Sequence, residues 1–435
     1  MLQENKLYTD KHMLCLINVK INSLSNILKT EYEYIIDHFC GKVFHEIPDN
    51  IPDDISIYVC GDVSKISIHN EYYVIKEFSY NYDENTKYNF IDLGKIPINI
   101  HNVGVYFRNF FDSNDTDYFN SIMSEHKFQH LTESNKPGTA FRKGIYITNV
   151  KTTETDTLEF NLLRCSSNLD GPTDNFRDTD NHIIKEVNNI NNKFFEQKVE
   201  LNHVLAQVYE NTKTHWIVIY FMIFVNYIWQ WIFGRYYYNL KNTEKKAKIK
   251  AHSDKTKDMP KNATMAFCTF YESFENNKFN YSDKKIKKAK NNIFDYYYGD
   301  CSVLTRLYFK LKPQVDDKSL AKEFSVILYP NSVFLIPLST NRLYTHEIRP
   351  SPLSIDKIPT RMGYVIRCSN TKAIFENKQT YIVEKDKKIK LEKPLEEDIV
   401  KVKDLYFREN TTTEKVSYDN IYFSFNEGDY LEPIL

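Results

Sequence analysis

Short strand-like runs dominate the pattern of hydrophobic positions along this chain. Apolar and polar residues alternate in runs such as EFSVILYP, SVFLIPL and TRMGYVIRCS, which follow one another at close spacing. Such a series predicts the strands of a closed or sandwiched β structure. Longer stretches with polar starts predict helices over about 24–39, 105–128 and 182–195. We therefore predict an α+β, mainly β fold with helices beside the strands.

Changes in this pattern divide the chain into three parts. Residues 1–100 combine short strands, one helix and Asn-rich acidic loops, and we interpret them as an N-terminal accessory domain. The regular series of strands runs over 101–370 and contains a polar, lysine-rich loop at about 272–300. Residues 371–435 have strand-like and acidic segments, and we interpret them as a C-terminal extension.

A nearly unbroken apolar run, residues 216–233, interrupts the middle part. Its length is at the lower limit for a membrane-spanning helix, but a crossing would place Tyr209 and His252 on opposite sides of the bilayer. A buried helix plus strand is a second interpretation. The third is an insertion over about 214–243, since the flanking segments would form a short polar hairpin without it. All three interpretations stay open, and we assign no site residue to the run.

Composition and charge exclude several classes of protein. The 435 residues include 57 Lys and Arg against 58 Asp and Glu, so any nucleic-acid surface would have to be a local patch. The seven cysteines include no CxxC pair, which argues against a disulfide framework or a zinc ribbon. The N-terminal residues lack the basic start and apolar run of a secretory signal. We therefore expect an intracellular, reducing compartment, the cytoplasm or the nucleus.

Three residues have the types and the order of a metal site. His252 and Asp254, in AKIKAHSD, are two positions apart, so an extended strand projects both side chains from the same side. His346 follows in RLYTHEI. Two histidines and one carboxylate that leave coordination positions open form the facial triad of non-haem iron(II) oxygenases. An HxD pair alone arises readily by chance, and a single histidine is more often structural.

Two arginines further along the chain make the set more specific. Arg361 and Arg367 are six positions apart in RMGYVIR, so a strand presents both guanidinium groups on one face. A 2-oxo acid chelates iron through its keto oxygen and adjacent carboxylate. An arginine fork can then bind the distal carboxylate at two points. The ordered set therefore predicts a metal centre with an anionic co-substrate.

With these motifs the chain resembles the AlkB-type branch of the 2-oxoglutarate- and iron(II)-dependent dioxygenases, over roughly 101–370. The resemblance implies a double-stranded β-helix, or jelly-roll, core with flanking helices. It implies that Fe(II) is bound by three ligands, His252, Asp254 and His346.

The resemblance also implies three co-substrate contacts. Arg361 would bind the distal carboxylate of 2-oxoglutarate, and Arg367 would lie at the metal-bound end. Tyr209, two positions after Gln207, would correspond to the tyrosine of an Asn-x-Tyr strand in that family.

The implied reaction consumes dioxygen and 2-oxoglutarate, forms succinate and hydroxylates a C–H bond, which removes the methyl group from an N-methylated base. No catalytic side chain beyond the metal centre is expected. Lysines on both sides of His252 are compatible with an alkylated nucleic acid, and equally with a solvated strand edge. The alternatives are a dioxygenase of a protein side chain or small molecule, and a non-enzymatic jelly-roll binding protein, membrane-attached through 216–233. The sequence predicts no oligomeric state.

Overall fold

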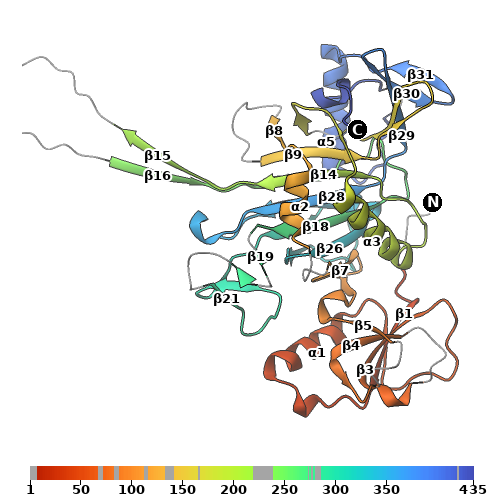
Figure 1. The fold of residues 1–435 in the computed structure, drawn as a ribbon, viewed down its shortest axis with the longest axis vertical. Helices are drawn as coiled ribbons and strands as arrows, with labels where there is room; N and C mark the ends of the chain where they lie inside the picture. Colours follow the sequence, from red (N-terminus) through yellow and green to blue (C-terminus); the bar gives the residue numbers. More distant parts are fainter. Residues whose placement is uncertain are drawn as a thin grey trace, which may run out of the picture.

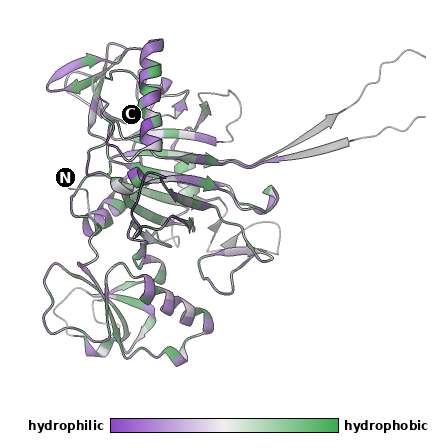
Figure 2. Ribbon diagram, turned by 180° about the vertical axis from the view of Figure 1, so that it is seen from behind, coloured by the Kyte–Doolittle hydropathy of each residue, from purple (hydrophilic) through white to green (hydrophobic). Residues whose placement is uncertain are grey.

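The computed structural model describes residues 7–66, 72–82, 88–111, 116–132, 142–164, 167–218, 239–272, 274–275, 278–279, 286–418 and 421–435. Within these ranges the protein is mainly β, with strands gathered into several sheets and a few helices beside them, as the sequence predicts. An N-terminal sheet lies at one end of the molecule and the C-terminal segments lie at the other, with a central β body between them (Figure 1). Hydrophobic residues recur along the strands of this body (Figure 2).

The N-terminal sheet is built entirely from parallel strands. Its order is β2-β1-β3-β4-β5, where these strands span Lys42–Phe44, His12–Ile17, Ser56–Asp62, Tyr72–Tyr80 and Asn89–Ile91. All six residues of β1 are buried, because Leu14 and Leu16 face the large central core while Met13 and Cys15 face a smaller separate one. A strand covered on both faces needs an unbroken apolar run, and HMLCLI supplies it.

Helix α1 (Asn26–His38) connects this sheet with the central body. Its residues Tyr32 and Ile35 belong to the same core cluster as residues of the central strands. A buried ion pair of 2.6 Å between Glu31 and Arg108 lies at the same junction. The N-terminal segment that we interpret as an accessory domain therefore packs against the body through a continuous apolar core.

The central body consists of two sheets. The larger has the order β12-β8-β9-β14-β28-β18-β26-β7-β6, with β13 paired to β9. Its strands span Asn168–Leu169, Gln129–Thr132, Arg142–Thr148, His203–Tyr209, Arg361–Arg367, Thr264–Tyr271, Ser332–Pro337, Gly104–Phe107, Ile98–Ile100 and, for β13, Asp174–Asn175. The smaller has the order β17-β27-β24-β25, spanning Ile249–His252, Tyr344–Arg349, Arg306–Leu311 and Glu323–Ile327. Phe309 on β24 and Phe334 on β26 make an edge-to-face contact, so the apolar faces of the two sheets meet.

Helices α2 (Tyr118–Glu125) and α3 (Asp178–Phe194) lie beside the larger sheet. The prediction of one helix over 105–128 is wrong in its first part, because Gly104–Phe107 is strand β7, paired with β26. Tertiary pairing thus overrides a helical pattern there. Helix α2 begins only after Asp117, whose carboxylate accepts a hydrogen bond from the backbone N–H of Asn120 at 3.1 Å.

Strands β15 (Thr212–Val218) and β16 (Asn239–Lys245) extend from the body as a two-stranded antiparallel arm (Figure 1). Their pairing begins with Thr212 opposite Lys245, so the two polar flanks of the apolar run form a hairpin. The run 216–233 enters the described structure only through the end of β15, and its greater part lies outside the described residues. Among the helices that are described, none is long and apolar enough to cross a bilayer.

The lysine-rich segment at about 272–300 contains short strands in its described part. Strands β21 (Ile286–Lys288), β22 (Tyr296–Tyr298) and β23 (Cys301–Ser302) form a small antiparallel sheet, and β19 (Phe274–Glu275) pairs with β20 (Lys278–Phe279).

The C-terminal segment returns to the body. Strands β29 (Thr371–Glu376), β30 (Gln379–Glu384) and β31 (Lys387–Lys390) extend a sheet that begins with β10 (Lys151–Thr152) and β11 (Leu158–Leu162). After them comes helix α5 (Glu396–Thr411), which the sequence analysis does not anticipate. Three acidic residues in its first turn complement the positive end of the helix dipole.

Candidate metal centre

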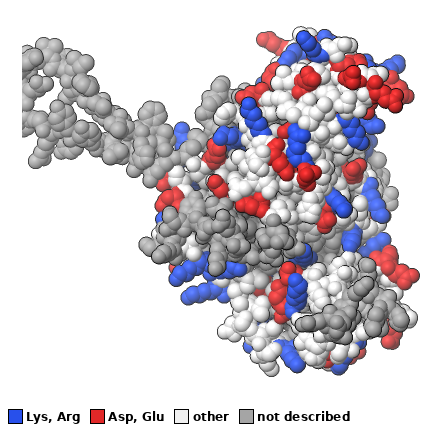
Figure 3. Space-filling view, viewed as in Figure 1, with Lys and Arg blue, Asp and Glu red and all other residues white. Residues whose placement is uncertain are grey.

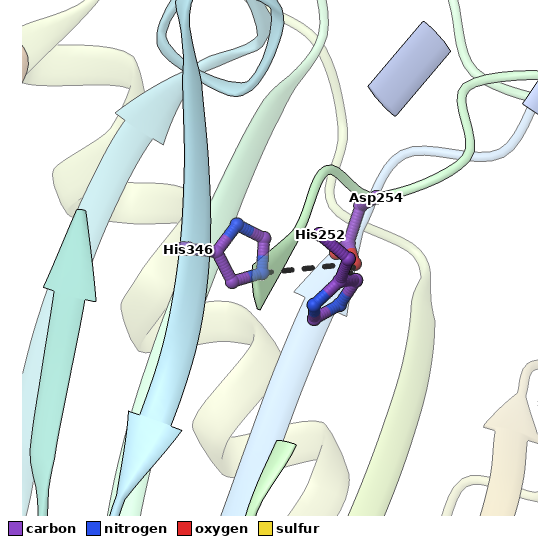
Figure 4. A group of neighbouring side chains, drawn as sticks. All are labelled: His252, Asp254 and His346. Carbon is purple, nitrogen blue, oxygen red and sulfur yellow. Dashed lines mark ion pairs between the residues drawn. The ribbon is translucent and has the colours of Figure 1, made fainter. Parts of the chain in front are cut away.

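Strand pairing brings the three predicted metal ligands together. His252 ends β17 and His346 lies on β27, and the two residues are direct partners across this antiparallel pair. Asp254 follows two residues after His252, in the connection toward β18. Figure 4 shows the three side chains turned toward one another.

The distances suit a single cation. The Nε2 atoms of His252 and His346 lie 3.4 and 3.8 Å from Oδ1 of Asp254, and one ligand atom from each residue lies within 4.8 Å of the others. Ligands about 2 Å from a metal ion at right angles to each other are about 3 Å apart. A small closing movement of the side chains would therefore place all three on one ion.

Both imidazoles are held by contacts within the protein. The Nδ1 atom of His252 lies 2.9 Å from the backbone oxygen of Lys250, an acceptor that orients the ring with its Nε2 atom toward Asp254. Burial and the neighbouring His252 lower the pKa of His346 to about 3, so its ring is neutral. Its Nδ1 has no hydrogen-bond partner in the described structure. The rings of Phe267 and Phe309 hold this imidazole by contacts of 5.6 and 5.7 Å between centroids.

Asp254 is ionised and fixed in place. Its burial opposes ionisation, but the Arg367 guanidinium, and after it a hydrogen bond from His252, hold the pKa of this carboxyl well below its usual range. Arg367 donates from Nε and Nη2 to Oδ2, at 3.0 and 2.7 Å. This leaves Oδ1, the oxygen nearest both histidines, directed toward the candidate ion. Arg367 therefore fixes both the orientation and the charge of the Asp254 carboxylate.

A side-chain amide fixes the backbone of the same residue. Asn341, in helix α4 (Leu338–Leu343), accepts from the N–H of Asp254 at 2.8 Å and donates to its carbonyl oxygen at 2.9 Å. The hydroxyl of Ser253 also donates to the backbone oxygen of Tyr344, which begins β27. The segment that precedes His346 therefore also orients Asp254. A single asparagine carries no sequence signal of this role.

Arg361 lies at the other end of β28 from Arg367. It is a direct cross-strand partner of Tyr209 on β14 and of Tyr271 on β18. The guanidinium stacks over the Tyr209 ring at 3.9 Å from the centroid, and the Tyr209 hydroxyl donates to Oε1 of Gln207 at 3.3 Å. Tyr209 therefore supports the arginine by stacking.

The Arg361 guanidinium is buried with unused donors. The residue is 3% exposed, and its Nε and Nη2 atoms have no hydrogen-bond partner in the described structure. A Cβ atom at Gly363 would lie 3.0 Å from Nη1 of this arginine. The guanidinium therefore lies over Gly363, two residues closer to Arg367, in space that any side chain would fill. Alternation on β28 places these three residues on the same face.

This arginine borders an opening to the surface. A pocket is lined by residues from the ends of β14, β27 and β28: Tyr209, Asn211, Ala247, Thr305, Ile348, Pro350, Ile358, Pro359 and Arg361. Sequence reasoning identified Tyr209 and Arg361 but not Gly363. The signal in the sequence that could have identified Gly363 is its position between two arginines on one face of the strand.

A second cluster with the composition of a metal site, Glu125, His126 and Asp180, has a different state. Both ring nitrogens of His126 are occupied, at 2.8 Å from Asp174 and 2.7 Å from Asp180. Burial opposes protonation, but the two carboxylates outweigh it and raise the pKa of His126 to about 9. This histidine is therefore a buried cation within an ion-pair network, with no lone pair for a metal.

Comparison with known proteins finds no relative by sequence. No family model matches the chain, and no curated protein matches it. One of the matching solved structures is the selenomethionine-labelled Fe(II)/(alpha)ketoglutarate-dependent dioxygenase TqaL. The two chains are 9% identical, the match covers 59% of this chain and 74% of that chain, and the TM-score is 0.25. Because this similarity is so low, the assignment of the site rests on the geometry of its own residues.

Proposed function

We propose that this protein is an Fe(II)- and 2-oxoglutarate-dependent dioxygenase in which His252, Asp254 and His346 bind the metal. Two imidazoles and one ionised carboxylate, with ligand atoms within 4.8 Å of one another, support this assignment. Three protein ligands leave three positions of an octahedral ion open for a chelating co-substrate and dioxygen. The same donors also suit catalytic zinc, so they do not select the chemistry by themselves.

One observation carries the choice of a 2-oxo acid: the buried guanidinium of Arg361 with two nitrogens that have no hydrogen-bond partner in the described structure. Leaving a charged donor buried and unsatisfied is costly unless a ligand completes it. A planar guanidinium pairs bidentately with a carboxylate. Because the guanidinium lies over Gly363, on the strand face that also carries Arg367, we propose that the co-substrate extends along this face from the metal to Arg361.

The chain's own residues bind the metal and orient the co-substrate. Fe(II) at this site would supply the redox chemistry that activates dioxygen, which protein side chains lack. Arg367 keeps Asp254 ionised and leaves one of its oxygens free for coordination. Arg361, supported by the Tyr209 ring, fixes the far end of the co-substrate.

We also propose that the central body is a double-stranded β-helix. Strands β14, β18, β26 and β28 belong to the larger sheet, and β17, β24, β25 and β27 to the smaller. The chain thus passes repeatedly between the sheets, which have the orders β14-β28-β18-β26 and β17-β27-β24-β25. This arrangement supports the assignment, because it brings Asp254, in the connection after β17, into contact with Arg367 on β28.

For the substrate, we propose an alkylated base of a nucleic acid, following the AlkB-type resemblance of the HxD, histidine and Arg-x5-Arg motifs. The exposed Lys248 and Lys250 beside His252 support an anionic substrate. Other lysines of this segment are engaged within the protein, since Lys246 donates to the backbone oxygens of Ser351 and Pro352. A base flipped out of its stack would have to reach this site, where His252 is partly exposed while Asp254 and His346 are buried.

The decisive experiment adds Fe(II) and 2-oxoglutarate without oxygen. A weak visible charge-transfer band should appear in the wild type and be lost in His252→Ala. In Arg361→Lys the band should need about 10-fold more 2-oxoglutarate, because the charge remains but the bidentate fork is lost. A protein that binds zinc but gives no band with Fe(II) and 2-oxoglutarate would overturn the proposal.

The substrate is tested separately by succinate formation in air. Oligonucleotides with N-methylated bases should stimulate it, while unmethylated oligonucleotides of the same sequence serve as the control. A protein side chain or small molecule is the second candidate, favoured by the mixed surface: Lys and Arg alternate with Asp and Glu over the face in Figure 3. Stimulation by peptides alone would reject the nucleic-acid substrate and leave the dioxygenase chemistry in place.

A further inference from the structure

The connection after β17 carries Asp254 but forms no strand pairing of its own. Ser253, Asp254 and Lys255 are nevertheless almost fully buried, at 0, 8 and 7% exposure. Buried backbone N–H groups are nearly always satisfied, because leaving one unpaired is costly. At three positions of this connection the backbone N–H donates to a side-chain oxygen, where a residue in a sheet would donate to the backbone of a neighbouring strand.

Two of these three oxygens come from helix α5. The N–H of Ser253 donates to Oδ1 of Asn410 at 2.7 Å, and the N–H of Thr256 donates to Oε1 of Glu409 at 3.1 Å. The hydroxyl of Thr256 donates to the same carboxylate oxygen. The third oxygen belongs to Asn341, which binds Asp254 itself. The backbone on both sides of Asp254 is therefore anchored to one helix of the C-terminal segment.

The two anchoring side chains are themselves held in one orientation. Nδ2 of Asn410 donates to the backbone oxygen of Tyr406 at 2.9 Å, which directs its amide oxygen to Ser253. Glu409 is 5% exposed, and its second oxygen accepts from the hydroxyl of Tyr418 at 2.5 Å. Each acceptor is thus preorganised for the connection that it binds.

Two lysines also donate hydrogen bonds to backbone oxygens in and directly after α5. The last carbonyl groups of a helix lack intrahelical donors and carry partial negative charge. Lys255, the residue directly after Asp254, donates at 3.1 Å to the backbone oxygen of Tyr406, which precedes those last carbonyl groups in the helix. Lys312, from the connection after β24, donates to the backbone oxygens of Glu409 and Thr412 at 2.7 and 3.1 Å. Lys255 therefore ties the ligand-bearing connection to α5, while Lys312 holds the end of the helix against the central body.

We infer that α5 is a positioning element of the metal centre, with Asn410 and Glu409 as its positioning residues. The inference rests on the proposed function, because it concerns the geometry of Asp254 as a ligand. Groups that orient the ligands of a metal ion typically change its affinity by about 10- to 100-fold when they are removed. The C-terminal segment is then part of the site, although it contributes no ligand.

The test compares Asn410→Ala with Asp404→Ala, which alters an exposed residue of the same helix. Fe(II) binding is measured by anaerobic calorimetric titration of the full-length protein, and melting of the metal-free protein is recorded alongside. Asn410→Ala should weaken Fe(II) binding by about 10- to 100-fold, while Asp404→Ala should leave it unchanged. Equal affinities in the two variants would refute the inference. Failure of the wild type to bind Fe(II) would instead reject the proposed function.

Conservative variants keep the test decisive if Asn410→Ala does not fold. Asn410→Asp keeps an acceptor for the N–H of Ser253 but loses the hydrogen bond to Tyr406, so it should bind Fe(II) more tightly than Asn410→Ala. Glu409→Gln keeps the size but loses one acceptor oxygen, and it should weaken binding severalfold. In Glu409→Gln the backbone N–H of Thr256 should also exchange its hydrogen faster, while β18 stays protected. Wild-type affinity and exchange in Glu409→Gln would overturn the inference.

Discussion

His252 and His346 face each other across strands β17 and β27, with their ring centroids 4.5 Å apart and their planes at 52°. Directly paired residues of an antiparallel pair present their side chains on the same face. The register of this pair shifts between Ile249 and His252, and such irregularities re-aim side chains next to functional sites. The pairing of two strands therefore brings two imidazoles to one position beside Asp254.

Replacement of His346 should abolish metal binding with little loss of structure. We expect His346→Gln to weaken Fe(II) binding by at least about 100-fold, because one of three protein ligands is lost. His182→Gln, at an exposed position of α3, is the matched control and should bind as the wild type does. Anaerobic titration with Fe(II) measures both. Unchanged affinity in His346→Gln would show that the metal, if bound, lies elsewhere.

A methyl group at Gly363 should separate co-substrate binding from metal binding. Its Cβ would lie 3.0 Å from Nη1 of Arg361 and 3.3 Å from the Tyr209 ring, so the guanidinium would have to move. We expect Gly363→Ala to weaken 2-oxoglutarate binding by roughly 10-fold, since displacements of this size cost catalytic sites 10- to 100-fold. Fe(II) affinity should stay the same.

The stability of the protein should fall at alkaline pH because of His126. Asp174 and Asp180 outweigh the effect of burial and raise its pKa to about 9, above the ordinary value of 6.5. Its ion pairs therefore contribute fully below about pH 6.5 and are lost as pH rises through 9. The loss can reach about 3 kcal/mol.

Urea denaturation at pH 6 and at pH 9.5 measures this effect. In His126→Gln the free energy of unfolding should be lower at pH 6 and should depend much less on pH over this range. His38→Gln, at an exposed position of α1, should keep the wild-type profile. A wild-type profile that is flat up to pH 9.5 would show that His126 is not charged.

Loss of Asp258 should destabilise the contact between the C-terminal segment and the central body. Its carboxylate pairs with Arg164 at 2.6 Å and accepts from the hydroxyl of Thr371 at 2.8 Å. Arg164 in turn donates to the backbone oxygen of Ile421. We expect Asp258→Ala to lower the free energy of unfolding by about 3–5 kcal/mol, because it leaves a buried cation uncompensated. Chemical denaturation measures the loss, and Asp404→Ala, at an exposed position of α5, is the control.

The sequence by itself determined the kinds of local structure and the kinds of ligand. Alternating apolar residues marked the strands that carry His346 and Arg361, because alternation depends only on two faces meeting different surroundings. The residue types in the HxD, histidine and Arg-x5-Arg motifs indicated metal and carboxylate binding, because the chemistry of a side chain is fixed by its residue type. The helix pattern over 105–128 was misleading where β7 found a partner in β26.

Only the tertiary structure decided which distant groups meet. The register of β17 against β27 put His252 opposite His346, and the position of Gly363 gave the Arg361 guanidinium its space. The buried N–H groups around Asp254 found their acceptors on Asn341 and Asn410, 87 and 157 positions away along the chain. A buried donor must be satisfied, but its own sequence neighbourhood does not specify which distant oxygen will reach it.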